Sequence, residues 1–393
     1  MLIVGIGGIL RHAAAAVLRD GELVAAIEEE KLRGVHGARR PGTLPLAAVR
    51  ACLKLAQAGA EAVDWVILAG PLGTGASSNM HLELKSLFPN GRVRVVDHHT
   101  AHASSAFFLS GVDRATVLTL DRSGDMRCGA LWAAEGITLR LEEELYAPDS
   151  PAELYGRITD LLGFRARSEE HKVQWLSAAG SPLYTDLFRQ VMGADSHRWP
   201  SFDRSCFDAN RQTHGGFSEK FFARLGVDSP DQIGEQMRLD LAASVQRAVE
   251  SVVLELAGSG ENLCLAGGLA LNTLLVSAVE NSGCYQNVYV QPAAGNAGTA
   301  LGAALYGWHH VLRRHERVPA GNLCYGPGFD REEIKKVLEN CKLRFRYLLT
   351  TGELIETAVK KLAEREIVAW YQGRMEFGPR ALGNRSILAS PLN

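Results

Sequence analysis

Three of the chain's 12 histidines lie within five residues, at His98, His99 and His102. His98 and His102 are four residues apart, so a helix places both imidazoles on one face, as metal ligands require. A buried strand expected over 116–120 leads directly to Asp121, and open α/β sheets place their chemistry at strand ends. The spacing favours a metal site, although such histidine pairs also occur on helix surfaces and in cores where the ring nitrogens have hydrogen-bond partners.

Two glycine-rich junctions stand between a strand and a helix. Gly267 and Gly268 form the first, with Asn272 a helical spacing further on, and Gly295 lies in the second. Glycines let a backbone approach a ligand closely and direct amide groups at it. We therefore expect contact with a phosphate or a nucleoside, with Lys172 as a candidate counter-charge. The alternatives are ordinary turns and a solvated lysine.

The loop 372–385 carries three arginines punctuated by glycines, Arg374, Arg380 and Arg385. A guanidinium group binds phosphate or carboxylate through two parallel hydrogen bonds, which lysine cannot match. The pattern therefore predicts an oxyanion pocket, and its alternative is a set of salt bridges at a domain edge.

The elements that position these residues follow one pattern twice. Each copy has three strands joined by tight turns and is followed by helical sequence. The strands are expected over 2–6, 13–18, 23–27, 116–120, 128–133 and 137–141. Two copies about 115 residues apart predict a duplicated sheet. That is the plan of the actin-like ATPase superfamily, in which a nucleotide sits between two similar lobes.

Further elements follow from periodicity and caps. Helices are expected over 44–57, 152–162, 236–256, 297–306, 331–338 and 351–363. Asn296 is expected at the N-cap of the helix over 297–306. Residues 196–219 have no clear period and are interpreted as a substrate-facing excursion, with a plain surface loop as the alternative.

The composition bounds the class of protein. At 393 residues, two or three domains are expected. A net charge of −2 argues against a nucleic-acid partner. The seven cysteines form no CxxC pair, which favours a reducing cytoplasm. No apolar run is long enough for a membrane span, so no membrane partner is expected.

Five motifs together resemble those of the O-carbamoyltransferases of the nodulation and antibiotic-tailoring type. They are HHTAH (98–102), LDRSGD (120–125), AGGLALN (266–272), PAAGNAGTALGAAL (292–305) and GRMEFGPRALGNRS (373–386). The resemblance implies an α/β, duplicated actin-like ATPase (ASKHA) fold similar to the tRNA threonylcarbamoyl transferases. Its lobes would span 1–113 and 114–318, and 319–393 would begin a YrdC-like domain.

The resemblance also implies a two-step reaction. The YrdC-like domain joins carbamoyl phosphate and ATP into carbamoyl-adenylate and releases pyrophosphate. The actin-like region then moves the carbamoyl group to a hydroxyl of a small natural product. The implied cofactors are ATP and iron(II) or another divalent transition metal. The resemblance leaves open whether magnesium is a further cofactor and whether the chain forms a homodimer.

The family's functional residues map onto positions of this sequence. By resemblance, the metal would be held by His98, His102, Asp121 and the position of Asn296, where the family has aspartate. Nucleotide contacts match Gly267, Gly268 and Asn272, beside which Lys172 and Gly295 are candidates. Arg374 and Arg380 match the carbamoyl phosphate side, to which we add Arg385. His12 and His99 are candidates near the acceptor hydroxyl, where a neutral imidazole could accept a proton.

Three departures from the family pattern leave alternatives open. Asn296 lacks the negative charge of an aspartate, and Ala13 follows His12 where the family has aspartate. Family members also continue well beyond the last motif, so the C-terminal domain is expected to be incomplete. The alternatives are a non-catalytic nucleotide-binding or scaffold protein, a tRNA threonylcarbamoyl transferase relative, and a sugar kinase of the actin superfamily.

Overall fold

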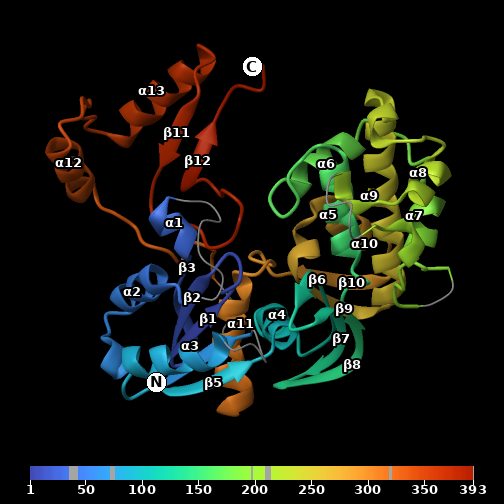
Figure 1. The fold of residues 1–393 in the computed structure, drawn as a ribbon. Coiled ribbons are helices and arrows are strands. Elements are labelled where there is room, and N and C mark those ends of the chain that lie inside the picture. Colours follow the sequence, from blue (N-terminus) through green and yellow to red (C-terminus); the bar gives the residue numbers. More distant parts are fainter. Residues whose placement is uncertain (35–42, 71–75, 196–197, 209–213, 318–320, 393) are drawn as a thin grey trace.

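The computed structural model describes residues 1–393 except 35–42, 71–75, 196–197, 209–213, 318–320 and 393. Two mixed sheets alternate with helical layers, and a smaller unit at the C-terminal end stands beside the first sheet (Figure 1). None of the helices in these residues is long and apolar enough to cross a membrane.

The two five-stranded sheets have the same topology, with orders β3-β2-β1-β4-β5 and β10-β9-β6-β7-β8. In each sheet the first strand is central, two antiparallel strands lie on one side and two parallel strands on the other. The strands are β1 (Leu2–Gly7), β2 (Ala14–Arg19), β3 (Glu22–Glu28), β4 (Trp65–Ala69), β5 (Arg92–Val96), β6 (Arg114–Gly124), β7 (Arg127–Glu135), β8 (Thr138–Tyr146), β9 (Gly260–Ala266) and β10 (Tyr285–Val290). The predicted duplicated actin-like fold is confirmed.

Helices cover both faces of each sheet. Residues of α2 and α3 pack on one face of the first sheet, and residues of α5 and α9 pack on the outer face of the second. The helices are α1 (Glu29–Arg33), α2 (Leu46–Leu55), α3 (Ala76–Leu87), α4 (His98–Phe107), α5 (Pro151–Leu161), α6 (Glu170–Ser177), α7 (Thr185–Val191), α8 (Glu219–Leu225), α9 (Glu235–Ala257), α10 (Thr273–Asn281), α11 (Gly298–Tyr306), α12 (Arg331–Asn340) and α13 (Thr351–Ala363). Because both faces are covered, adjacent residues such as Val117 and Leu118 belong to different core clusters.

The middle layer consists of α4 and α11, which pack against each other and exchange sheets. α4 follows the first sheet in sequence but packs against β6 and β9, whereas α11 follows the second sheet and packs against β1, β2 and β4. Small residues allow the close approach, since a Cβ on Gly302 would lie 1.7 Å from the carbonyl oxygen of Ala101. A boundary at residue 113 therefore separates the two sheets, but α4 and α11 each pack against the sheet on the other side of that boundary.

One local prediction differs from the structure, and a second segment is described only in part. The helix after β10 begins at Gly298 with Ala297 as its N-cap, so Asn296 lies outside the helix and does not cap it. The described part of 196–219 packs inward through Phe202, Cys206 and Phe217, which are buried with the residues of α5 and α9. Its other residues, 196–197 and 209–213, lie outside the described part of the chain.

The C-terminal unit consists of α12, α13 and a hairpin of β11 (Val368–Tyr371) and β12 (Arg385–Leu388). Neither helix buries a residue, and large apolar side chains such as Val337 of α12 and Val359 of α13 are 58% and 59% exposed. These helices are amphipathic without a covered apolar face in the described residues. That the unit begins a YrdC-like domain stays a prediction.

We expect Gly302→Ala to destabilise the fold, because the added methyl group collides with backbone of α4 that has no room to shift. Overpacking of this kind costs about 1–3 kcal/mol, which exceeds the gain in helix propensity of about 1 kcal/mol. Thermal unfolding measures the change. Gly352→Ala is the matched control, since a Cβ on this helical glycine would meet only the Thr350 hydroxyl, at an ordinary contact distance of 3.8 Å. Equal unfolding temperatures for both variants would contradict the role of the α4–α11 contact.

Candidate metal and ligand site

The start of α4 brings the histidines to the end of β6. Asp97 caps the helix by accepting a hydrogen bond from the Thr100 N–H at 2.9 Å. The backbone N–H of His98 donates to the Asp125 carboxylate, also at 2.9 Å, which ties the helix start to the turn after β6. Because α4 packs on β6, one face of its first turn points at Asp121.

The side chains of His98, His102 and Asp121 converge on one point. The Asp121 Oδ2 atom lies 3.0 Å from His98 Nε2 and 3.3 Å from His102 Nε2, and the two Nε2 atoms are 3.1 Å apart. Metal–ligand bonds of about 2.0–2.2 Å place neighbouring ligand atoms about 3 Å apart. Two imidazoles and one carboxylate are donors that suit a divalent transition metal. The donor set therefore fits such an ion.

Burial sets the protonation states of this cluster. It lowers the pKa of His102, which is fully buried, and the neighbouring His98 lowers it further. For Asp121, burial acts to raise the pKa, but the hydrogen bonds with His102 and His98 outweigh it and hold the pKa well below its usual range. A neutral imidazole and an ionised carboxylate are the forms that bind a metal. The Nδ1 atom of His102 is buried without a partner among the described residues.

Glycines around the cluster are required by close packing. A Cβ on Gly124 would lie 2.1 Å from His98 Cδ2, and one on Gly268 would lie 3.0 Å from Asp121 Oδ1. Gly267 has a φ of +96°, and its Cβ would lie 2.1 Å from the Leu120 carbonyl oxygen. The first predicted glycine junction thus packs against the end of β6, directly beside Asp121.

A cavity of about 50 Å³ lies beside His98, between the equivalent turns of the two sheets. Its lining residues are Gly8, Ile9, Leu10 and Arg11 after β1, Ala69 and Gly70 at the end of β4, Ser123, Gly124 and Asp125 after Asp121, and His98 and Asn296. Thr299 fixes Asn296 there, because its hydroxyl donates to the Asn296 carbonyl at 2.6 Å and accepts from the Gly8 N–H at 3.0 Å. The structure therefore brings Asn296 to the same cavity as His98.

The two histidines predicted near the acceptor hydroxyl have different surroundings. His12 is half-buried in the β1–β2 turn, and its Nδ1 atom is 3.3 Å from the Glu30 carboxylate. His99 is fully buried, with Nδ1 2.9 Å from the Thr119 hydroxyl. Burial, and then the nearby His98 and His102, lowers its pKa well below the usual value. The structure thus places His12 toward the surface beside the cavity turn and His99 in the core.

The predicted nucleotide residues other than the glycine pair make contacts within the fold. The Asn272 side chain accepts from the Leu275 N–H at 3.1 Å as the N-cap of α10, and it exchanges hydrogen bonds with Gln246. The Lys172 ammonium group pairs with Glu169 at 2.8 Å. Gly295 lies against Leu271 in the second junction.

The three arginines of the loop 372–385 donate to three different sets of carbonyl oxygens. Arg374 donates to Tyr325, Gly326 and Val24, Arg380 to Leu271, and Arg385 to Gln372, Gly373 and Asn384. Arg385 also stacks over Tyr371, with its guanidinium carbon 3.5 Å from the ring centre. In the described structure these guanidinium groups hold the loop in place rather than converge on one pocket.

A carboxylate organises this loop. Glu376 is 2% exposed, and its Oε1 atom accepts from the backbone N–H groups of Leu382, Asn384 and Arg385 at 2.8–3.1 Å. Burial acts to raise its pKa, but the backbone donors outweigh burial and lower the pKa to about 2. The sequence pattern points to the arginines of this loop, whereas the role of Glu376 follows only from its contacts with three backbone N–H groups.

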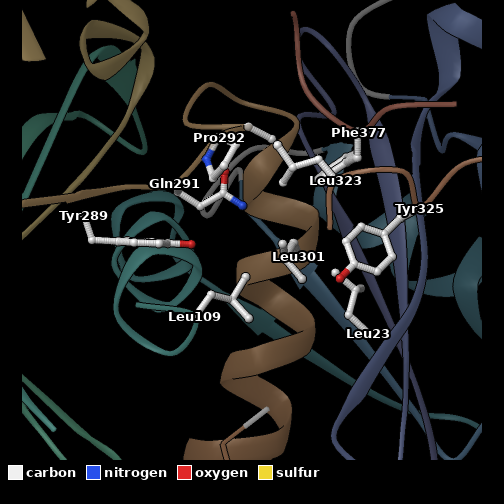
Figure 2. A pocket seen from close by; sticks show the side chains of 10 residues that line it. Leu23, Leu109, Tyr289, Gln291, Pro292, Leu301, Leu323, Tyr325 and Phe377 are labelled. Atoms are coloured by element: carbon white, nitrogen blue, oxygen red, sulfur yellow. The ribbon is translucent and has the colours of Figure 1, made fainter. Parts of the chain in front are cut away.

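The loop 372–385 contacts both halves of the molecule, the first built on the sheet β3-β2-β1-β4-β5 and the second on the sheet β10-β9-β6-β7-β8. The Lys31 ammonium group donates to the carbonyl oxygens of Glu376 and Gly378 at 2.8 and 2.6 Å. Phe377 lines a small cavity of about 20 Å³ together with Leu23 from β3 and Pro292 from the connection after β10 (Figure 2). The C-terminal unit is therefore attached at the seam between the sheets.

Comparison with known proteins gives consistent matches. A family model for the carbamoyltransferase N-terminus matches residues 75–305, and a second, for the carbamoyltransferase C-terminus, matches residues 359–393. The uncharacterized protein sll1178 of Synechocystis is 34% identical over 100% of this chain and 71% of its own length. The nodulation protein NolNO of Sinorhizobium fredii is 29% identical over 97% of this chain and 58% of its own.

The nodulation protein NolO of Bradyrhizobium diazoefficiens is 30% identical over 75% of this chain and 53% of its own length. The chain thus spans between about half and seven tenths of the length of these relatives.

We expect Glu376→Gln to loosen the loop, because an amide offers the three N–H donors a neutral oxygen in place of an ionised one. Hydrogen bonds to a charged group contribute about 1.5–3 kcal/mol. Since the pKa is lowered, this stability is present above the ordinary value of 4.5 and is lost as pH falls towards about 2. Limited proteolysis and thermal unfolding between pH 7 and 3 measure it. Glu356→Gln, at an exposed position of α13, is the control, and equal behaviour of the two variants would contradict the role.

Proposed function

Because the chain belongs to the carbamoyltransferase family, we propose that its site takes part in ATP-dependent O-carbamoyl transfer. The donor is carbamoyl phosphate, activated through carbamoyl-adenylate, and the acceptor is a hydroxyl of a small-molecule natural product. The observation that carries the proposal is the convergence of His98, His102 and Asp121 beside the cavity between the two sheets. Donors of this kind at a strand end support metal-assisted chemistry rather than a purely structural role.

The proposed metal is iron(II) or another divalent transition ion, held by His98, His102 and Asp121 with the side-chain oxygen of Asn296. Such an ion, when bound, supplies a Lewis acid that polarises the carbamoyl carbonyl. The chain's own contribution is to keep the His102 imidazole neutral by burial and the Asp121 carboxylate ionised. Gly124 leaves the space that His98 needs to point into the site.

The proposed nucleotide lies at the glycine junction. Gly267 and Gly268 bring backbone close to Asp121 without a side chain between them and a ligand. This supports ATP or an adenylate whose phosphate reaches the metal position. Asn272 holds this junction by capping α10, and Lys172 pairs with Glu169 at α6.

The proposed acceptor enters beside the β1–β2 turn. His12 is half-exposed there, and the Glu30 carboxylate 3.3 Å away orients its imidazole. An imidazole held in this way accepts the proton of an attacking hydroxyl. His99 is buried and contributes through packing beside His102 instead.

One observation favours a second candidate, a non-catalytic nucleotide-binding member of the family. Asn296 offers the proposed ion a neutral oxygen where the resemblance implies an aspartate. The loss of one negative charge weakens a cation site, because ligand charge contributes directly to affinity. Metal binding and transfer therefore have to be measured separately.

We expect Asn296→Asp to raise the affinity for cobalt(II), used as a spectroscopic probe, by about tenfold or more. His102→Ala should abolish binding, because it removes one of three converging donors. Titration of metal-depleted protein followed by visible absorption measures both. Asn281→Asp, an exposed change on α10, controls for net charge. Undiminished cobalt binding by His102→Ala would rule out the proposed site.

Transfer is tested by supplying synthetic carbamoyl-adenylate to the iron-loaded chain with a panel of hydroxyl acceptors. We expect a carbamate ester detected by mass spectrometry, at a rate that falls at least 100-fold in His98→Ala. The variant's unfolding temperature controls for misfolding. Cobalt binding without any ester would favour the non-catalytic candidate.

A further inference from the structure

His98 is the candidate metal ligand that lies at the end of a helix. It is the first residue of α4, and its side chain is 14% exposed. His102, one turn further along α4, has a fully buried side chain. Helix ends fray unless their free backbone N–H groups find partners. The place of His98 therefore depends on what holds the first turn of α4.

Two carboxylates hold this first turn. Asp97 caps it by accepting from the Thr100 N–H. Asp125 accepts from the His98 N–H. Asp97 directly follows β5 of the first sheet, whereas Asp125 lies in the turn between β6 and β7 of the second sheet. The helix start is thus supported from both halves, and the two supports have to keep their relative positions.

Arg127 connects the two supports. It begins β7 directly after the turn that contains Asp125, and its Nη1 atom lies 3.1 Å from Asp97 Oδ1. Its Nε atom pairs with the Glu144 carboxylate of β8, which also accepts from the Tyr146 hydroxyl at 2.6 Å. The side chains of Arg127, Asp97 and Glu144 are 20–24% exposed, so solvent screens these pairs only in part. One guanidinium group therefore bridges the cap of α4 to the second sheet.

The turn before Arg127 has an unfavourable backbone conformation. Its two central residues, Asp125 and Met126, have positive φ values of +53° and +72°. Glycine and asparagine suit this conformation, whereas a methionine is disfavoured there. The Met126 side chain is 75% exposed, so burial does not compensate the strain. Such strain persists where surrounding contacts fix it, and here Asp125 contacts α4 while Arg127 contacts Asp97.

We propose that Arg127 is a positioning residue for the candidate metal site, because it fixes His98 through Asp97. Arg127 is not among the described residues that line the cavity at His98, so it acts through the cap of α4. Metal affinity depends on such support, because a loosely held ligand has to be ordered when the ion binds. The inference rests on the proposed function for the role of the site, whereas the hold on α4 exists without an ion.

The first test is titration of the metal-depleted full chain with cobalt(II), followed by visible absorption. We expect Arg127→Met to weaken binding about tenfold and to change the absorption bands, because the ligand geometry loosens. Arg127→Lys should recover only part of the affinity, since an ammonium group cannot bridge two carboxylates as the planar guanidinium group does. Arg140→Gln is the matched control, because Arg140 is exposed on β8 and pairs with Glu142.

Hydrogen exchange of the metal-depleted chain tests the hold on α4 without any ion. We expect the segment 97–103 to exchange about tenfold faster in Arg127→Met than in the wild type, because the first turn of α4 opens more often. The long helix α9, which Arg127 does not support, should keep its wild-type rate. Equal acceleration in α9 would mean a general loss of stability and would overturn a local role of Arg127.

The outcomes separate this inference from the proposed function. A wild type that binds no cobalt contradicts the proposed metal, and the exchange of the segment 97–103 then decides the role of Arg127 by itself. Unchanged exchange of this segment in Arg127→Met overturns the inference. Faster exchange with unchanged cobalt affinity and absorption also overturns it, because His98 would then be positioned without Arg127.

Discussion

The close contact between α4 and α11 is the constraint on which the site depends. Gly302 lies where any side chain would meet the Ala101 backbone, so the two helices form one thin layer between the sheets. This layer carries His98 and His102 to the end of β6 and holds Asn296 just before the other helix. Because each helix packs against the sheet of the opposite half, a shift of one half displaces the site.

The C-terminal loop is a second point of attachment, organised by charge rather than by packing alone. Glu376 collects three backbone N–H groups, and Lys31 holds the same loop to the first sheet. Buried ionised groups of this kind are stable only with several donors. The arginines of the loop add further attachment, because their guanidinium groups donate hydrogen bonds to backbone carbonyl oxygens. The helices α12 and α13 contribute little to this attachment, since neither buries a residue.

The charges around the cavity are divided between the two halves. Asp121 and Asp125 supply negative charge near His98, and Arg11 of the β1–β2 turn lines the same cavity. The cavity is sensitive to the relative position of the halves, because its lining residues come from both of them.

The sequence by itself determined the duplicated strands and the grouping of His98, His102 and Asp121, because hydrophobic period and helical spacing are local properties. The motifs also identified the carbamoyltransferase family. Only the tertiary structure decided what depends on distant partners. Gly267 needs a positive φ because it meets β6, Asn272 caps α10 and contacts Gln246, and Arg374 binds carbonyl oxygens of β3 and the segment before α12. Likewise, Arg11 lines the same cavity as His98 only because two turns far apart in sequence close that cavity.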